Sequence, residues 1–127
     1  MTGTAEDDIF SSFAADDTMR GGAGNDLFTA VGGHDTIISD SNDADQFIFS
    51  ADYFYLVGKT DITGFNGAGT VNGDQLHFRN NPGDQAVLNI STEGGKTIFN
   101  LTTPFGTSTQ VTVDAVELEE GADYFFA

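Results

Sequence analysis

The sequence predicts an all-β protein in which a parallel β-roll is followed by an antiparallel β cap. Three observations support this fold class. A unit of Asp, any residue and a large apolar residue recurs every nine residues in the first part of the chain. Glycine and aspartate fill the intervals between these units, and two alternating apolar–polar runs joined by a Gly-Gly pair follow later. Regular internal periodicity takes precedence over local propensity when a fold is assigned.

The repeat predicts the strands of the roll. The spacing is nine residues between the first four aspartates and ten before the fifth, and the paired apolar residues are Phe10, Met19, Phe28, Ile37 and Phe47. Each unit predicts a three-residue strand whose central side chain faces inward, because side chains alternate along a strand. Glycine and aspartate between the strands favour chain reversal. A strand and a turn form half a coil, so about five half-turns are expected, with the three Phe side chains on one sheet facing Met19 and Ile37 on the other.

The same geometry stacks the aspartates. Units one, three and five lie on one side of the roll and place Asp8, Asp26 and Asp45 in a column, while Asp17 and Asp35 stack on the opposite side. Neighbouring strands lie about 4.8 Å apart, so stacked carboxylates repel each other unless a cation lies between them. Ca²⁺ accepts six to eight oxygen ligands at about 2.3–2.6 Å. The sequence therefore predicts Ca²⁺ between turns; the alternative, turn-forming aspartates in a metal-free solenoid, leaves the stacked like charges unexplained.

Composition narrows the possible partners. The 127 residues carry 20 acidic and 4 basic side chains, a formal net charge of -16. Nucleic acid is excluded as a partner because phosphate binding requires clustered Lys and Arg, and an anionic membrane surface is disfavoured for the same reason. No apolar run is long enough to insert into a membrane. The absence of cysteine excludes disulfides and thiolate metal sites.

The stretch GGAGNDLFT at residues 21–29 resembles the nonapeptide G-G-x-G-x-D-x-U-x of the RTX proteins, a calcium-binding repeat. The resemblance implies a right-handed parallel β-roll in a bacterial protein exported by type I secretion. Carried over by position, it implies carboxylate ligands at Asp8, Asp17, Asp26, Asp35 and Asp45 and carbonyl ligands at Gly22, Gly24 and Gly33.

Several positions depart from the repeat. Glu6, Ala15 and Asp43 replace the glycine at the fourth position, and Asp43 is a further candidate ligand. Ala30-Val31 replaces a leading Gly pair, and Ser39 is an additional residue before the fifth unit. We therefore expect about two to four Ca²⁺ ions, with the Asp8/Asp26 and Asp17/Asp35 pairs as the main sites.

We expect residues 1–50 to form the calcium-binding roll and residues 51–127 the capping region. The stretch TDITGFNGAGTVNGDQL resembles the segment after the roll in serralysin metalloproteases and in the R-modules of mannuronan C-5 epimerases. This resemblance makes Asp61 and Asp74 candidate ligands, although Gly64 stands where an Asp is usual. Residues 86–101 predict a β-hairpin turning at Gly94-Gly95, and residues 110–116 predict a third antiparallel strand, reached through a loop over residues 102–109. The terminal GADYFFA resembles the end of type I secretion substrates and is also consistent with a last cap strand.

No catalytic motif is recognisable. His34 and His77 are the two histidines, and the chain contains neither an HExxH signature nor a recognisable Ser-His-Asp context. We expect no enzyme activity. The expected function is a module that folds on extracellular calcium, supports type I secretion and stabilises an attached N-terminal catalytic or repeat domain. The alternative is a module that binds an alginate-like polysaccharide, with Ca²⁺ bridging the anions, for an attached carbohydrate-active enzyme.

Overall fold

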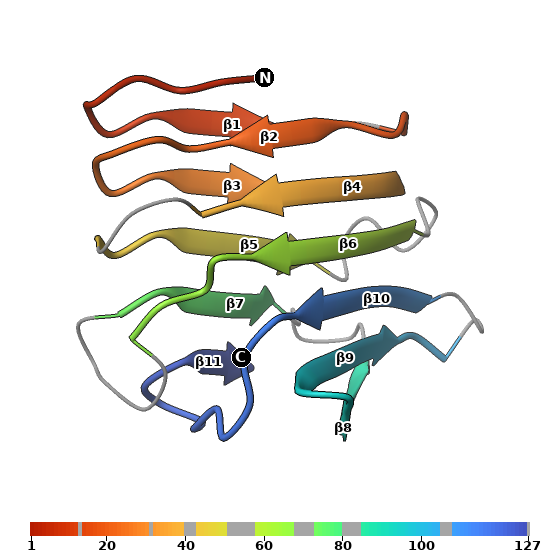
Figure 1. Ribbon diagram of the computed structural model, residues 1–127. Coiled ribbons are helices and arrows are strands. Elements are labelled where there is room, and N and C mark those ends of the chain that lie inside the picture. Colours follow the sequence, from red (N-terminus) through yellow and green to blue (C-terminus); the bar gives the residue numbers. More distant parts are fainter. Residues whose placement is uncertain are drawn as a thin grey trace.

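Two β-sheets face each other and enclose the core (Figure 1). The computed structural model describes residues 1–12, 14–30, 32–39, 43–50, 58–67, 73–79, 85–104 and 108–126. The first sheet contains, in spatial order, β1 (Ile9–Ser11), β3 (Leu27–Thr29), β5 (Gln46–Ser50), β7 (Gln75–Arg79) and β11 (Tyr124–Phe126). The second contains β2 (Thr18–Arg20), β4 (Gly33–Ile38), β6 (Gly58–Thr63), β10 (Ser108–Val113), β9 (Lys96–Thr102) and β8 (Val87–Glu93).

The chain alternates between the two sheets from β1 to β7, and this alternation builds the parallel roll. Phe10 pairs with Phe28 and Phe28 with Phe47 in one sheet, while Met19 pairs with Ile37 in the other. All of these pairings are parallel. The predicted register and the predicted fold class, an all-β protein with a parallel roll, are confirmed.

The core is a column of aromatic rings between the sheets. Phe10 stacks on Phe28 with ring centroids 5.0 Å apart, and Phe28 stacks on Phe47 at 5.2 Å. Met19 and Ile37, which belong to the opposite sheet, are completely buried. Offset stacking of this kind adds to the stabilisation from apolar burial, so the repeat places its largest side chains where they hold successive turns at a fixed spacing.

The parallel stacking continues beyond residue 50. Strand β6 pairs in parallel with β4, and β7 pairs in parallel with β5. The roll therefore includes a further turn that the nine-residue spacing does not mark. Residues 51–57, which follow the expected boundary between roll and cap, lie outside the described part.

The cap closes the C-terminal end of the roll. Strands β8 and β9 form the predicted hairpin, with Gly94 and Gly95 at φ 57° and 80°, and β10 pairs with β9 antiparallel as predicted. The other edge of β10 pairs in parallel with β6, and β11 pairs in parallel with β7. The cap thus continues both sheets of the roll; residues 105–107 of the expected loop before β10 lie outside the described part.

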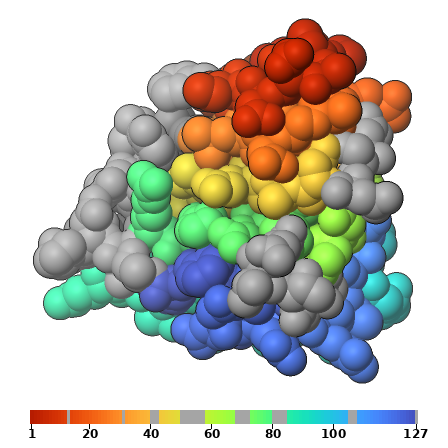
Figure 2. All heavy atoms as spheres, turned by 90° about the vertical axis from the view of Figure 1, so that its left-hand side faces the viewer, coloured from red at the N-terminus to blue at the C-terminus, as the bar shows by residue number. Residues whose placement is uncertain are grey.

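The turns of the roll lie on two opposite sides. The turns that lead into β1, β3, β5 and β7 lie on the left in Figure 1, and Figure 2 views this side directly, with layers following one another from the N-terminal to the C-terminal end. Strands β2, β4 and β6 begin on the right in Figure 1. Among the described residues, no helix has the length and apolar character needed to cross a membrane.

Candidate metal centre

Two rows of aspartates run along the roll. The long aspartate row is on the side seen in Figure 2, where one aspartate directly precedes each of β1, β3, β5 and β7, namely Asp8, Asp26, Asp45 and Asp74. The short aspartate row is on the opposite side and consists of Asp17 and Asp35. The structure thus stacks Asp8, Asp26 and Asp45 on one side and Asp17 and Asp35 on the other, and it places Asp74, another candidate ligand, at the end of the long row.

In the long row, the carboxylates of Asp26, Asp45 and Asp74 reach back to the turn before, whereas that of Asp8 accepts from Thr4 in its own turn. The amide of Asp8 donates to Asp26 Oδ1 at 2.8 Å, that of Asp26 to Asp45 Oδ1 at 2.8 Å, and that of Asp45 to Asp74 Oδ1 at 2.9 Å. Asp26, Asp45 and Asp74 are 2%, 1% and 0% exposed. A peptide N–H therefore lies between successive carboxylates and offsets part of their repulsion, a contact that the repeat pattern does not reveal.

The second carboxylate oxygens differ from turn to turn. The Ser39 hydroxyl lies 2.6 Å from Asp45 Oδ2 and 3.0 Å from Asp74 Oδ2, and the amide of Asn66 donates to Asp74 Oδ2 at 3.0 Å. A hydroxyl has one proton, so Ser39 donates to only one of the two carboxylates at a time. Asp26 Oδ2 is buried and has no hydrogen-bond partner. The long row therefore contains an acceptor whose burial is not compensated by the protein.

Asp43 adds a third carboxylate near the end of the long row. One oxygen each from Asp43, Asp45 and Asp74 lie within 4.8 Å of one another. A single ion with oxygen ligands at about 2.3–2.6 Å fits between atoms at this separation. Among the described residues, these are the three metal-ligating side chains whose ligand atoms come this close to one another.

Burial makes ionisation of Asp26 and Asp74 unfavourable. It is the largest cause that raises the pKa of Asp26 to about 6, and the charges of Asp45, Asp8 and Asp43 raise it further. Burial likewise raises the pKa of Asp74 to about 7, and the charge of Asp45 adds to the shift. The charged groups that produce these shifts are other aspartates, so a cation among them would favour the ionised forms.

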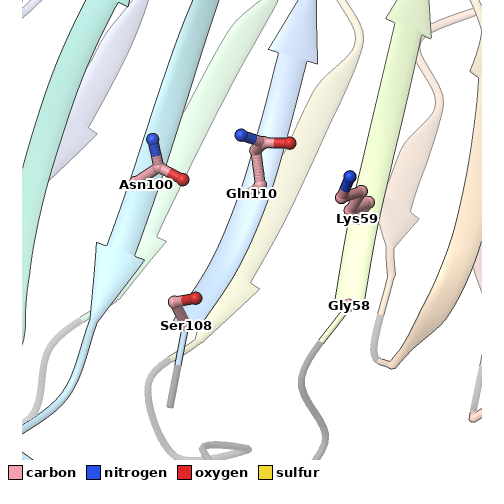
Figure 3. A pocket seen from close by; sticks show the side chains of 5 residues that line it. All are labelled: Gly58, Lys59, Asn100, Ser108 and Gln110. Carbon is pink, nitrogen blue, oxygen red and sulfur yellow. The ribbon is translucent and has the colours of Figure 1, made fainter. Parts of the chain in front are cut away.

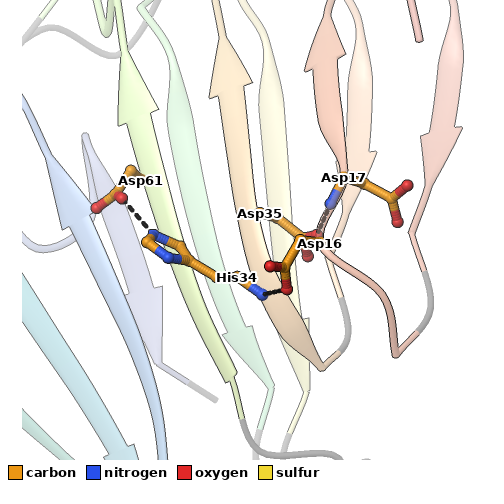
Figure 4. A network of polar contacts seen from close by, with 5 residues as sticks. All are labelled: Asp16, Asp17, His34, Asp35 and Asp61. Carbon is orange, nitrogen blue, oxygen red and sulfur yellow. Dashed lines mark hydrogen bonds and ion pairs between the residues drawn. The ribbon is translucent and has the colours of Figure 1, made fainter.

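The short aspartate row has different contacts. The amide of Asp17 donates to Asp35 Oδ1 at 2.9 Å, and the Ser12 hydroxyl donates to Asp35 Oδ2 at 2.8 Å. Asp35 is fully buried, and burial is the largest cause that raises its pKa. The carboxylate of Asp17 points away from Asp35 (Figure 4). The row ends here, because β6 presents Thr60 in register with Asp35.

Asp61 lies apart from both rows. It stands on β6 between the buried residues Thr60 and Ile62, so alternation along the strand turns its side chain to the outer face. There its Oδ2 lies 2.6 Å from His34 Nε2 (Figure 4). The structure does not bring this predicted ligand near the other carboxylates.

The predicted glycines adopt the left-handed conformation, with φ 92° at Gly22, 102° at Gly24 and 70° at Gly33. A Cβ on Gly24 would lie 2.6 Å from the carbonyl oxygen of Glu6 in the preceding turn. Only glycine combines this φ with such a close approach. These residues therefore allow the turns to stack closely, which brings the aspartates of each row together.

Two functional serines were not identified from the sequence. Ser12 and Ser39 are 4% and 2% exposed, and their hydroxyls bond to the aspartates of the rows. Their amides donate to Thr29 and Thr63, as the amide of Gly21 donates to Ile38. Both serines thus occupy the first position of a turn, and a serine at that glycine position is the signal that identifies them.

Solved structures that are similar to this one include a lipase and a subunit of an epimerase. The structure is similar to the extracellular lipase LipA from Serratia marcescens, with 24% identity and a TM-score of 0.48, over 91% of this chain and 18% of the lipase. It is also similar to the AlgE6R2 subunit of the Azotobacter vinelandii mannuronan C5-epimerase, with 19% identity and a TM-score of 0.40, over 94% of this chain and 91% of that subunit. No protein-family model and no curated protein matches the chain.

Proposed function

We propose that this chain is a calcium-binding RTX-type module of a secreted bacterial protein, and that it folds when it meets calcium outside the cell. The observation that carries the proposal is the second oxygen of Asp26, which is buried without a hydrogen-bond partner among like-charged neighbours. A neutral protein donor would satisfy this oxygen but would leave the summed negative charge of the row. A divalent cation compensates both, and carboxylate oxygens are ligands that Ca²⁺ prefers.

The ligands that we assign to calcium are the long row, Asp8, Asp26, Asp45 and Asp74, together with Asp43. Extracellular calcium modules typically have dissociation constants of about 10⁻⁴–10⁻³ M. An ion that binds only the folded state stabilises it by RT ln(1 + [L]/Kd) at each independent site. Several weak sites therefore add up to a large shift between low calcium inside a cell and millimolar calcium outside it.

This dependence explains why a secreted chain would carry such a row. Without calcium, the repelling carboxylates oppose stacking of the turns and leave the folded state of this acidic chain only partly populated. This favours passage through a type I secretion channel and still allows the stability of the metal-free protein to be measured with urea. With calcium, the roll becomes rigid and stabilises an N-terminal domain attached to it. The RTX-like stretch GGAGNDLFT and the terminal GADYFFA support this role.

The test is circular dichroism against calcium concentration, starting from protein in chelator, with magnesium as the control. We expect β-structure to increase as calcium reaches the millimolar range, and magnesium to be much less effective because it demands a small octahedral site. Equal β-content in chelator and in millimolar calcium would contradict the proposed switch.

A second candidate function is polysaccharide binding, and one surface feature favours it. The outer face of the six-stranded sheet has an open hollow of about 360 Å³ lined by Gly58, Lys59, Asn100, Ser108 and Gln110 (Figure 3). Lys59, Gln110 and Asn100 lie in one register row across β6, β10 and β9. Amide side chains beside a cation can form hydrogen bonds and an ion pair with an acidic sugar.

One titration distinguishes polysaccharide binding from calcium-dependent folding alone. Alginate oligomers are added at fixed, saturating calcium while amide resonances are followed, with Lys59→Gln as the test variant and Lys96→Gln as a control outside the hollow. Polysaccharide binding predicts shifts around Lys59 and Gln110 that the first variant weakens and the second leaves unchanged. The absence of shifts in the wild-type protein would rule out this candidate and leave calcium-dependent folding intact.

A further inference from the structure

We infer that calcium binds along one side of the roll only, in the turns of the long aspartate row, and that the short row is held by hydrogen bonds without an ion. The inference rests on the proposed calcium binding and specifies where it occurs. It departs from the expectation, drawn from the repeat, that the Asp17/Asp35 pair is a main site. The contacts of two equivalent residues, Asp26 and Asp35, carry it.

Asp26 and Asp35 are a matched pair in the fold. They are 2% and 0% exposed, and each accepts through Oδ1 a hydrogen bond from the amide of the aspartate one turn earlier, at 2.8 Å and 2.9 Å. They differ at Oδ2. The Ser12 hydroxyl donates to Asp35 Oδ2 at 2.8 Å, whereas Asp26 Oδ2 is buried without a partner. Because an unsatisfied buried carboxylate oxygen is costly, Asp26 requires a ligand that Asp35 already has.

The source of this difference is the first residue of the preceding turn. Gly3 begins the turn before that of Asp26 and has no side chain, and Gly21 within the turn of Asp26 has no hydroxyl to donate either. Ser12 begins the turn before that of Asp35, and its buried hydroxyl provides the donor. Ser39 makes a similar contact in the long row, but there Asp43 brings a third carboxylate to the pair that the serine contacts.

The number of carboxylates around Asp26 and around Asp35 also differs. The charges of Asp8, Asp43 and Asp45 all act on Asp26. In the short row, the charges of Asp17 and Asp16, both shown in Figure 4, act on Asp35, so that Asp35 has two carboxylate neighbours where Asp26 has three. The next position in register is Thr60, which ends the row. Among the described residues, three metal-ligating side chains come together in the long row, at Asp43, Asp45 and Asp74, and no such group is found in the short row.

The experiment compares Asp26→Asn with Asp35→Asn, which remove the same charge from equivalent positions with little change in shape. Calcium stoichiometry and affinity are measured by isothermal titration calorimetry, and stability by urea unfolding in chelator. We expect Asp26→Asn to bind at least one ion fewer, or to bind calcium about tenfold more weakly, and to be more stable than wild type in chelator. We expect Asp35→Asn to keep the wild-type stoichiometry and an affinity within about twofold.

Loss of an ion in Asp35→Asn, as in Asp26→Asn, would overturn the inference, and so would an unchanged calcium response in Asp26→Asn. A wild-type protein that binds no calcium would instead overturn the proposed function. Ser12→Ala decides between the two outcomes if Asp35→Asn does not fold, because it removes only the hydroxyl bonded to Asp35. It should lower the urea midpoint equally in calcium and in chelator, and a loss confined to calcium would show that this side holds an ion.

Discussion

Replacing Asp74 with asparagine should stabilise the metal-free protein at pH 8. Asp74 is fully buried, and burial is the main cause that raises the pKa of its carboxyl from 3.8 to about 7. At about 1.4 kcal/mol per pKa unit, ionisation of this group lowers the free energy of unfolding of the metal-free protein by about 4 kcal/mol. Asparagine removes the charge and keeps an oxygen that accepts from the amide of Asp45.

The loss of one hydrogen bond offsets part of this stabilisation. The amide of Asn66 donates to Asp74 Oδ2, and the Asp74→Asn variant places an NH₂ group there, which leaves a donor unsatisfied at a cost of about 1–3 kcal/mol. The net stabilisation at pH 8 is therefore about 1–3 kcal/mol. Because the native pKa lies above the unfolded one, the ionisation penalty grows from about pH 4 and is complete above about pH 7. At pH 4 the variant should accordingly be the less stable protein.

The assay is urea unfolding followed by circular dichroism in chelator, at pH 8 and at pH 4, for the wild type and Asp74→Asn. A crossing of the two stabilities between these pH values is the expected result. A variant that is less stable than wild type at both pH values would refute the reasoning, because burial of an ionised carboxylate would then not oppose folding. Saturating calcium at pH 8 should reverse the order, since the variant lacks one proposed ligand.

Three further predictions concern the row, the turns and the core. Metal-free wild-type protein should lose stability as the pH rises from about 4 to about 7, because the native pKa values of Asp26 and Asp74, about 6 and about 7, exceed the unfolded value. A free energy of unfolding, measured with urea in chelator, that stays constant or increases over this pH range would contradict this prediction. Gly24→Ala should cost more than Gly95→Ala in urea unfolding, because both residues have positive φ but only Gly24 abuts the neighbouring turn, and equal losses would count against tight turn stacking. Phe28→Ala should cost about 3–5 kcal/mol by the same method because it leaves a cavity between two stacked rings, and a loss below about 1 kcal/mol would show that the aromatic column is not well packed.

Periodicity made much of the fold predictable. The nine-residue spacing was sufficient to place Phe10, Phe28 and Phe47 on one sheet and to stack Asp8, Asp26 and Asp45, because each turn repeats the same geometry. The spacing could not show that Asp74 extends this row, since 29 residues separate it from Asp45 and the sequence between them does not keep the nine-residue spacing. The parallel pairing of β10 with β6 was missed as well, because it depends on which roll edge the cap meets.

The contacts within the candidate site were less predictable than its residues. The repeat pattern does not mark Ser12 and treats Ser39 as an additional residue, whereas in the structure their hydroxyls contact carboxylates of the rows. The pattern also treats Asp26 and Asp35 as equivalent, although their second oxygens have different surroundings. Asp61 was grouped with Asp74 by resemblance, but strand alternation places it outside, beside His34. Hydrogen bonding between turns thus decides which aspartates remain available to an ion.

The most direct test of this account is an anomalous difference map from crystals grown in calcium, recorded at a wavelength where calcium scatters anomalously. The account predicts calcium peaks in the turns of the long row, within about 2.3–2.6 Å of oxygens of Asp26 and its neighbours. A well-ordered roll whose long-row carboxylates contact only protein atoms and water would contradict the central claim.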